Sequence, residues 1–387
     1  MLSYVIPRRI GESDARSLVR FGLPAGRIAA HVAPGILHMV PYYRVTAEEI
    51  RWQNGDEEGP PEEDEGLRFT SRVIEKNFVA RETGVLPPSL GVRAQALELR
   101  LFDREALPPD VVVVSPDLTP RLARARALDD TADVHARALL RVVLQIVYFP
   151  FWMSTVSGDG APRVAVVDAV AGALICGDVE PESVDRLARG VPRRSRSVGF
   201  RPLACPNCGW DLPLRKDDVL FQCSSCERGW LARADRLDPV SFSVTATTGP
   251  PPDRHLPVWQ LSGGHGEAPI FAPAFRCRRL KALLHVGARL TRAGLSLERA
   301  EHIPRDLVGC ALDEEDARAF ARFVAAGIAF EAAAGASRPD LPAHVESLSA
   351  ELLWLPFRSD GYALREPVTG TPVPSRLLDL DLADPRK

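Results

Sequence analysis

Two closely similar stretches decide the centre of this chain: Cys205-Pro206-Asn207-Cys208-Gly209-Trp210 and Cys223-Ser224-Ser225-Cys226-Glu227-Arg228-Gly229-Trp230. Two residues between cysteines let one tight turn present both sulfurs to a single ion, and a second such turn completes a tetrahedron. Gly209 is expected to adopt the positive φ that such a turn needs, because only glycine does so at little cost. The spacing therefore predicts one structural metal ion, most simply zinc, bound by Cys205, Cys208, Cys223 and Cys226. Four protein ligands would leave no open coordination position for catalysis.

The residues between and after the cysteine pairs are expected to form short strands at 211–214, 219–222 and 230–231. Over about 203–234 the chain resembles the zinc-ribbon superfamily. Members of that superfamily occur in transcription factors, polymerase subunits, ribosomal proteins and bacterial proteins that only bind partners, so the resemblance implies the metal ligands and no further site residue. A rubredoxin-like iron centre for electron transfer uses the same four ligands and stays an alternative.

Elsewhere the sequence contains similar segments, which predict small α+β modules. A helix pattern at 14–21 recurs at 316–323, and each is followed by an apolar strand that ends in proline and an aromatic residue. A weaker third copy has its helix at 135–141 and its strand at 146–152. Proline is expected only at the edge or the end of such strands. The strand pattern occurs at 36–43, 146–152, 255–259, 271–275 and 352–357, and hairpins are expected to continue two of the copies over 163–172 and 361–370.

The predicted fold is therefore α+β, with repeated small antiparallel-sheet and helix modules and an inserted zinc ribbon. By pattern alone, the chain outside the ribbon resembles uncharacterised bacterial zinc-ribbon proteins with repeated L-P-F-W hairpins, which imply no activity. The expected segments are a first α+β repeat (1–55), an acidic linker (56–66), a second repeat (67–185), an Arg-rich linker (186–202), the ribbon (203–237), a β-rich module (238–300) and a third repeat (301–387).

Charge and composition give no global attraction to nucleic acid, because the net charge is −3. Only four of the 48 basic residues are lysine, so arginine is abundant throughout the chain. One arginine cluster directly precedes the ribbon, and Arg193, Arg194 and Arg196 are its candidate phosphate contacts. The sequence has no stretch long and apolar enough to predict a membrane span and no secretory signal pattern. Seven cysteines, four of them in paired C-x-x-C, favour a metal site in a reducing cytoplasm over disulfides.

No H-E-x-x-H, G-x-S-x-G, Walker A or G-x-G-x-x-G motif is present, so we expect no enzyme and identify no small-molecule substrate. The favoured hypothesis is a non-catalytic scaffold or assembly subunit that binds other protein subunits. A nucleic-acid-binding zinc-ribbon protein and an iron electron-transfer subunit are the alternatives. The proline-aromatic strands suggest a partner surface made of Tyr42, Tyr43, Phe151, Trp152 and Trp259.

Overall fold

The computed structural model describes most of the 387 residues. The described ranges are 3–23, 31–52, 69–81, 84–89, 98–128, 137–158, 160–189, 203–213, 218–232, 236–247, 249–263, 268–295, 297–304, 307–333 and 341–378. Helices and strands are both present and strand predominates, which agrees with the expected α+β class. Of the helices in these ranges, none combines the length and the apolar character that a membrane span requires.

The chain divides into two compact units, each built from non-contiguous segments. Unit 1 comprises Met1–Ala47, Ile74–Asp130 and Val142–Phe200. Unit 2 comprises Glu48–Val73, Thr131–Arg141 and Arg201–Lys387. The seven contiguous segments expected from the sequence stay a prediction, and the compact units divide the chain differently because long strands contribute to both.

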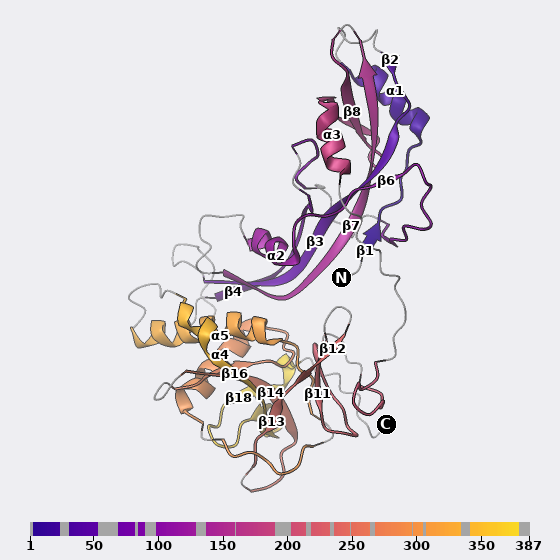
Figure 1. Ribbon diagram of the computed structural model, residues 1–387. Coiled ribbons are helices and arrows are strands. Elements are labelled where there is room, and N and C mark those ends of the chain that lie inside the picture. Colours follow the sequence, from indigo (N-terminus) through magenta and orange to yellow (C-terminus); the bar gives the residue numbers. More distant parts are fainter. Residues whose placement is uncertain are drawn as a thin grey trace. The chain divides into compact units, whose positions relative to one another are not determined.

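Unit 1 is built on a sheet with the strand order β4-β3-β7-β1-β5. β2 and β8 also pair with β7, β6 pairs with β3, and β9 pairs with β8. The long strands β3 and β7 lie side by side (Figure 1). The elements that contribute to unit 1 are β1 (Ser3–Val5), α1 (Glu12–Gly22), β2 (His31–Val32), β3 (Ile36–Trp52), β4 (Phe69–Val79), β5 (Arg100–Leu101), β6 (Val112–Val113), α2 (Pro120–Leu128), β7 (Arg137–Ser157), β8 (Arg163–Asp168), β9 (Ala173–Val179) and α3 (Pro181–Ala188).

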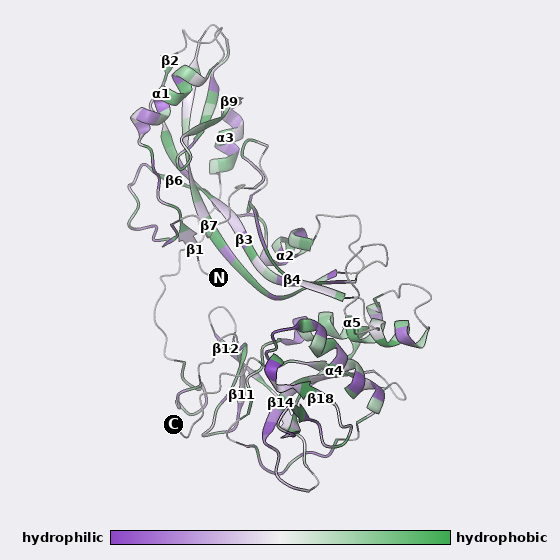
Figure 2. Ribbon diagram, turned by 180° about the vertical axis from the view of Figure 1, so that it is seen from behind, coloured by the Kyte–Doolittle hydropathy of each residue, from purple (hydrophilic) through white to green (hydrophobic). Residues whose placement is uncertain are grey.

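Unit 2 contains a small sheet, β10-β11-β12, and a larger one ordered β15-β14-β16-β17-β18, in which β13 also pairs with β16. Both long helices of this unit, α4 and α5, carry hydrophobic and hydrophilic stretches (Figure 2). The elements are β10 (Leu220–Gln222), β11 (Gly229–Ala232), β12 (Leu237–Val240), β13 (Phe242–Val244), β14 (Arg254–Ser262), β15 (Ile270–Pro273), α4 (Leu280–Ala293), α5 (Glu314–Ala332), the 3-10 helix η4 (Ala343–Ser347), β16 (Ser349–Ser359), β17 (Ala363–Arg365), β18 (Pro372–Pro374) and the 3-10 helix η5 (Ser375–Leu377).

The expected helices at 14–21 and 316–323 are present as parts of α1 and α5. Asp313 caps α5, because its side chain accepts a hydrogen bond from the N–H of Asp316, and three acids occupy the first turn. The helix expected at 135–141 was wrong: its described residues, from Arg137 on, belong to β7. The pairing of this segment within a long strand outweighs its helical sequence pattern.

Four of the five prolines of the repeated pattern lie inside strands, so for these the prediction that they would stand at strand edges or ends was wrong, whereas Pro273 ends the edge strand β15 as predicted. Pro41 lies within β3, Pro150 within β7, Pro257 within β14 and Pro356 within β16. A proline has no N–H to donate, but its carbonyl can still accept. Three of these carbonyls do accept a hydrogen bond from an alanine N–H, which ties each proline to a neighbouring segment.

The first of these arrangements surrounds Pro150 in unit 1. Its carbonyl accepts from the N–H of Ala169 at 3.2 Å, and the Ala169 carbonyl in turn accepts from the N–H of Ile10 at 3.2 Å. Trp152, two residues after the proline, donates its indole N–H to the Ile10 carbonyl at 3.2 Å. Since α1 begins two residues after Ile10, these bonds fix the entry to the helix.

The same bonds recur around Pro41. Its carbonyl accepts from the N–H of Ala80 at 2.9 Å, and the Ala80 carbonyl accepts from the N–H of Leu118 at 3.1 Å. Tyr43 donates its hydroxyl to the Leu118 carbonyl at 2.8 Å. Helix α2 begins two residues after Leu118, so this arrangement also precedes a helix.

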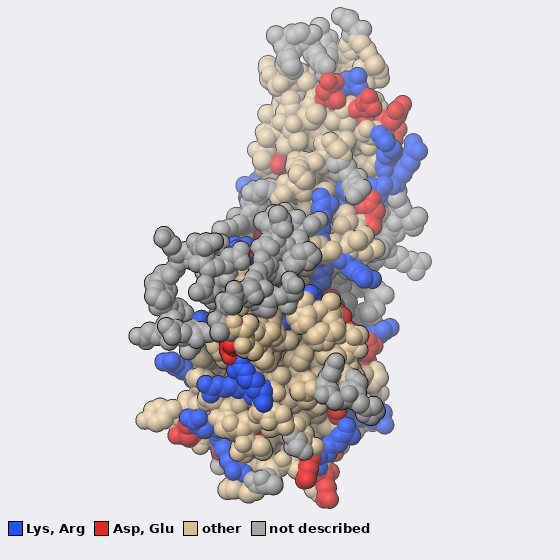
Figure 3. All heavy atoms as spheres, turned by 90° about the vertical axis from the view of Figure 1, so that its left-hand side faces the viewer, with Lys and Arg blue, Asp and Glu red and all other residues tan. Residues whose placement is uncertain are grey.

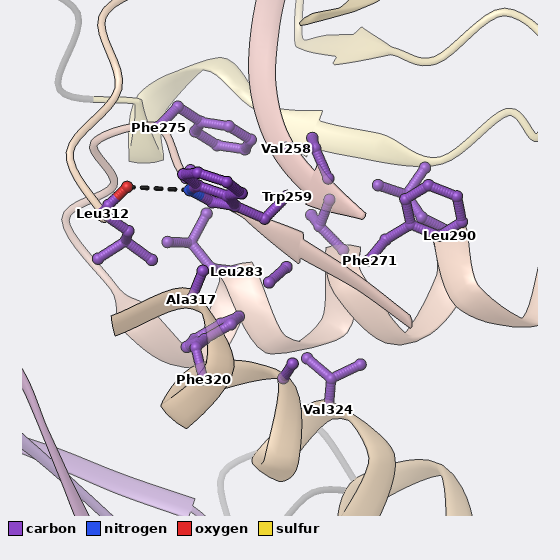
Figure 4. Packing of buried hydrophobic residues seen from close by; sticks show 14 of the residues in the cluster. Val258, Trp259, Phe271, Phe275, Leu283, Leu290, Leu312, Ala317, Phe320 and Val324 are labelled. Carbon is purple, nitrogen blue, oxygen red and sulfur yellow. Dashed lines mark hydrogen bonds between the residues drawn. The ribbon is translucent and has the colours of Figure 1, made fainter. Parts of the chain in front are cut away.

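A third occurrence lies in unit 2, around Pro257. Its carbonyl accepts from the N–H of Ala274 at 2.9 Å, and the Ala274 carbonyl accepts from the N–H of Ala311 at 2.6 Å. Trp259 donates its indole N–H to the Leu312 carbonyl at 3.0 Å (Figure 4). Helix α5 begins two residues after Leu312. The aromatic residue two positions after each of the three prolines therefore anchors the start of a helix.

The five aromatic residues suggested as a partner surface lie in the protein core, so that suggestion was wrong. Tyr42 and Tyr43 are fully buried, and Phe151, Trp152 and Trp259 are at most 5% exposed. Around Trp259 the side chains of Phe275, Leu283, Ala317 and Phe320 gather into one apolar cluster (Figure 4). Burying such large apolar side chains is the main stabilising term in folding, and the burial leaves them unable to touch a partner.

The two expected hairpins share one turn geometry. Asp168 accepts hydrogen bonds from the N–H groups of Val170 and Ala171, both at 2.7 Å. The carboxylate of Glu366 accepts from the N–H groups of Val368 and Thr369 in the same way. Glu366 therefore plays the same part in its turn as Asp168 does in the first hairpin.

Candidate metal centre

Two tight turns of matching geometry present the four cysteines. In the first, the N–H of Gly209 donates to the Cys205 carbonyl at 2.9 Å, and in the second the N–H of Glu227 donates to the Cys223 carbonyl at 2.9 Å. Gly209 has φ +75°, as the sequence predicted, and Glu227 has φ +60°. Glu227 is thus the counterpart of Gly209. Sequence reasoning missed it because glutamate rarely adopts positive φ, although its place directly after the second cysteine pair was a usable signal.

The four sulfurs form one group, all within 4.8 Å of one another. The Sγ atoms of Cys205 and Cys226 are 3.6 Å apart, and those of Cys208 and Cys223 are 3.5 Å apart. Four sulfurs placed tetrahedrally at the usual zinc–sulfur distance lie about 3.8 Å from one another. The residues therefore fit a metal ion with four thiolate ligands. In the described part of the chain this is the only such group of three or more His, Cys, Asp or Glu.

The ligands differ in their surroundings. Cys205 and Cys223 are buried, Cys226 is half-buried and Cys208 is exposed. Without metal, the backbone N–H of Arg228 lowers the pKa of Cys226 to about 6, while burial raises the pKa of Cys223 to about 12. Burial also raises the pKa of Cys205, but the backbone N–H groups of Cys208 and Asn207 outweigh that effect and lower it overall. These N–H groups favour the thiolate forms that a metal ion requires.

A small apolar cluster supports the two turns from within. It contains Leu212, Phe221 and Trp230 beside the buried cysteines. β10 and β11 pair antiparallel, with Phe221 opposite Trp230. The module is joined to the rest of unit 2 through Val219, whose N–H donates to the Cys310 carbonyl at 2.9 Å. Metal binding would thus hold the turn between β10 and β11, at 223–226, against the turn at 205–208.

Replacing Glu227 with Gly is expected to stabilise the module by about 1 kcal/mol. The left-handed backbone costs a non-glycine residue about 1–2 kcal/mol, which exceeds the extra entropy that glycine loses on folding. The matched control is Ser225→Gly in the same turn. Ser225 has no positive φ, so this substitution should destabilise the module. Thermal unfolding of the metal-bound protein measures both variants. A lower midpoint for Glu227→Gly would contradict the strained geometry.

The other residues proposed from the sequence do not join this site. Arg193, Arg194 and Arg196 lie outside the described residues, as does the acidic linker. A separate hollow of about 740 Å³ in unit 1 is lined by charges of both signs, including Arg81, Arg163 and Asp178. Its arginines are engaged: Arg81 donates to the Arg186 carbonyl at 2.8 Å, and Arg163 lies 3.3 Å from Asp178. This hollow is therefore held together by its own polar contacts.

In comparisons with known proteins, no family model, no curated protein and no solved structure matches this chain.

Proposed function

We propose that this protein is a non-catalytic, zinc-binding scaffold or assembly subunit of a larger protein complex. The observation that carries the proposal is the cluster formed by Cys205, Cys208, Cys223 and Cys226. Four thiolates complete the tetrahedral coordination that zinc prefers and leave no position for water or substrate. The ion would therefore hold the β10-β11-β12 module in its folded form, which is the role of closed zinc sites.

The rest of the chain is proposed to have arisen by duplication of one α+β module. Its support is the arrangement that recurs around Pro41, Pro150 and Pro257, in which the same backbone groups are satisfied in the same order before a helix. Matching hydrogen bonds at three places argue more strongly for a shared origin than similar composition does. Repeated modules supply several similar surfaces, which suits a subunit that contacts more than one neighbour.

The surface for protein partners is proposed at aromatic residues that the fold leaves exposed. Trp210, beside the first cysteine pair, is 59% exposed, and Tyr362, next to β17, is 90% exposed. Large aromatic side chains with little conformational freedom commonly dominate the energy of protein interfaces. These two residues take the place of the buried aromatic residues that the sequence suggested.

Metal analysis and affinity purification from the native host test this proposal. We expect one zinc ion per purified chain and a defined set of protein subunits that co-purify. Trp210→Ala should lose those subunits while retaining zinc, because the side chain points to solvent beside the site. Phe21→Ala is the matched control, since Phe21 is 89% exposed but lies in unit 1. A protein that holds zinc but purifies without any stable partner contradicts the scaffold role.

The alternatives remain separate proposals with their own measurements. Iron in the four-cysteine site would give visible absorption in the freshly purified protein, whereas zinc is colourless. Binding of nucleic acid through Arg193, Arg194 and Arg196 stays a prediction. Replacing these three residues with Glu should abolish a salt-dependent shift with RNA or DNA if the prediction is right. The proposed location is the cytoplasm, where thiols stay reduced and available to metal.

A further inference from the structure

One segment of unit 2 contains basic residues and no acidic ones, although the net charge of the whole chain is −3. Between residues 268 and 297 the sequence contains no Asp or Glu. Its basic residues are Arg276, Arg278, Arg279, Lys281, His285, Arg289 and Arg292. Figure 3 shows one face of the molecule, on which several Lys and Arg side chains lie close together with few Asp or Glu side chains beside them.

Helix α4 arranges four of these residues on one side. Its buried side contains Leu283, Leu284 and Leu290, which pack in the core of unit 2. Lys281, His285, Arg289 and Arg292 follow one another at intervals of four, four and three residues, which places them along one face of the helix. Arg289 and Arg292 are exposed, whereas Lys281 and His285 are half-buried. The solvent side of α4 therefore carries four basic side chains and no acidic one.

At its C-terminal end, the basic face of α4 borders a hollow of about 350 Å³. Arg289 and Arg292 line it on the helix, and Thr369 and Thr371 line it from the turn between β17 and β18. The two threonine hydroxyls lie 2.7 Å apart, and that of Thr369 also accepts from the N–H of Thr371 at 3.1 Å. Because one hydroxyl proton can serve this contact, the other can be donated to a ligand.

Two guanidinium groups and a hydroxyl donor in one hollow match the oxygens of a phosphate group. Among the charged residues that face them, Glu331 of α5 forms an ion pair with Arg292. The partial negative charge at the helix C-terminus is about half a unit, which is smaller than the charge of the two arginines. A phosphate in the hollow would take Arg289 as its main cationic partner and share Arg292 with Glu331.

We infer that the basic face of α4, together with this hollow, binds the phosphodiester backbone of nucleic acid. Residues four apart on a helix rise by about 6 Å, whereas each DNA strand carries a phosphate every ~3.4 Å along the duplex axis. Lys281 and Arg289, eight residues apart on this face, can therefore each reach a different phosphate of a continuous strand, whereas the Nε2 of His285 between them is buried. A free phosphate would occupy only the hollow and would not contact the rest of the basic face of α4. This inference uses residues that are not part of the metal centre.

Fluorescence anisotropy with a labelled single-stranded and a labelled duplex oligonucleotide tests the inference on the full-length, metal-bound protein. We expect at least one of them to bind. The double variant Lys281→Ala, Arg289→Ala should bind about tenfold or more weakly, because each phosphate contact contributes to affinity. The slope of log affinity against log salt should fall in magnitude by about two, since each lost contact removes about 0.9.

The matched control is Arg299→Ala, which removes an exposed arginine of unit 2 that pairs with Glu351. This control should bind as the unchanged protein does. Equal thermal midpoints for all forms establish that they are folded, and the Gln variants at 281 and 289 replace the Ala variants if they are not. Absence of binding, or equal binding by the double variant and the control, would overturn the inference. Equal displacement of the oligonucleotide by polyglutamate of the same charge would overturn it too, because it would indicate a general anion surface.

Discussion

Replacing Cys223 with Ser is expected to abolish metal binding and to unfold the module that contains β10, β11 and β12. Cys223 is fully buried, and its Sγ lies 3.5 Å from that of Cys208. The variant leaves three thiolates, and serine is a poor ligand for zinc. Structural zinc sites contribute about 10–16 kcal/mol of apparent binding free energy at neutral pH, and in a small module that energy is folding energy. Metal per chain, measured by mass spectrometry, should fall from one to near zero.

Cys176→Ser is the matched control, because Cys176 lies in unit 1 and outside the four-sulfur group. It should retain one ion per chain. Hydrogen exchange would follow the loss of structure, with peptides that cover 218–232 losing protection in Cys223→Ser and keeping it in the control. A Cys223→Ser protein that still carries one ion per chain would contradict the ligand set. Added chelator should reproduce the exchange pattern of the variant in the unchanged protein.

The four-cysteine cluster was predictable because its determinants are local in sequence. Two residues between the cysteines and a glycine directly after Cys208 specify a tight turn without reference to the rest of the fold. The start of α5 was also accessible, since acids at Asp313 and in the next three positions favour a helix N-terminus wherever they occur. In both cases short-range chemistry fixes the backbone, and tertiary contacts only add to it.

The role of the proline-aromatic strands could not be predicted, because it depends on distant partners. Pro150 and Trp152 take their meaning from Ala169 and Ile10, and the sequence gives no sign that Ile10 lies beside them. The same pattern of an apolar strand with a large aromatic residue suits an exposed interface and a buried core equally well. Only the position of the neighbouring segments decides between the two, and here it places the aromatic residues inside.

The pairing of charged residues near the ends of β3, β4 and β7 likewise could not be predicted from the sequence. This ion-pair group carries the second large expected effect. Glu49 is 1% exposed and accepts from the Nε of Arg72 at 2.6 Å and from Arg137. Beside this group Trp52 packs edge-on against Phe69, with ring centres 4.6 Å apart. All of these residues belong to unit 2.

Replacing Glu49 with Ala is expected to destabilise unit 2 by about 3–5 kcal/mol. The substitution leaves Arg137, whose side chain is only 9% exposed, without its buried counter-charge, and breaking a buried ion pair from one side costs about that much. Urea unfolding, with hydrogen exchange of peptides that cover the end of β3, measures the effect. Glu98→Ala is the control: Glu98 pairs with Arg100 and both side chains are more than 60% exposed, so the change should stay below about 1 kcal/mol.

Acid gives a second test of the same carboxylate. Burial raises the pKa of Glu49, but the hydrogen bonds from Arg72 and Arg137 outweigh burial and hold the pKa below its ordinary value of 4.5. A carboxylate whose pKa is lower in the folded state stabilises the fold above its unfolded pKa, and this contribution is lost as the pH falls through the folded pKa. The unchanged protein should therefore lose stability more steeply below pH 4.5 than Glu49→Gln, which has no proton to take up. Parallel acid curves for the two proteins would show that Glu49 is not the charged centre of this ion-pair group.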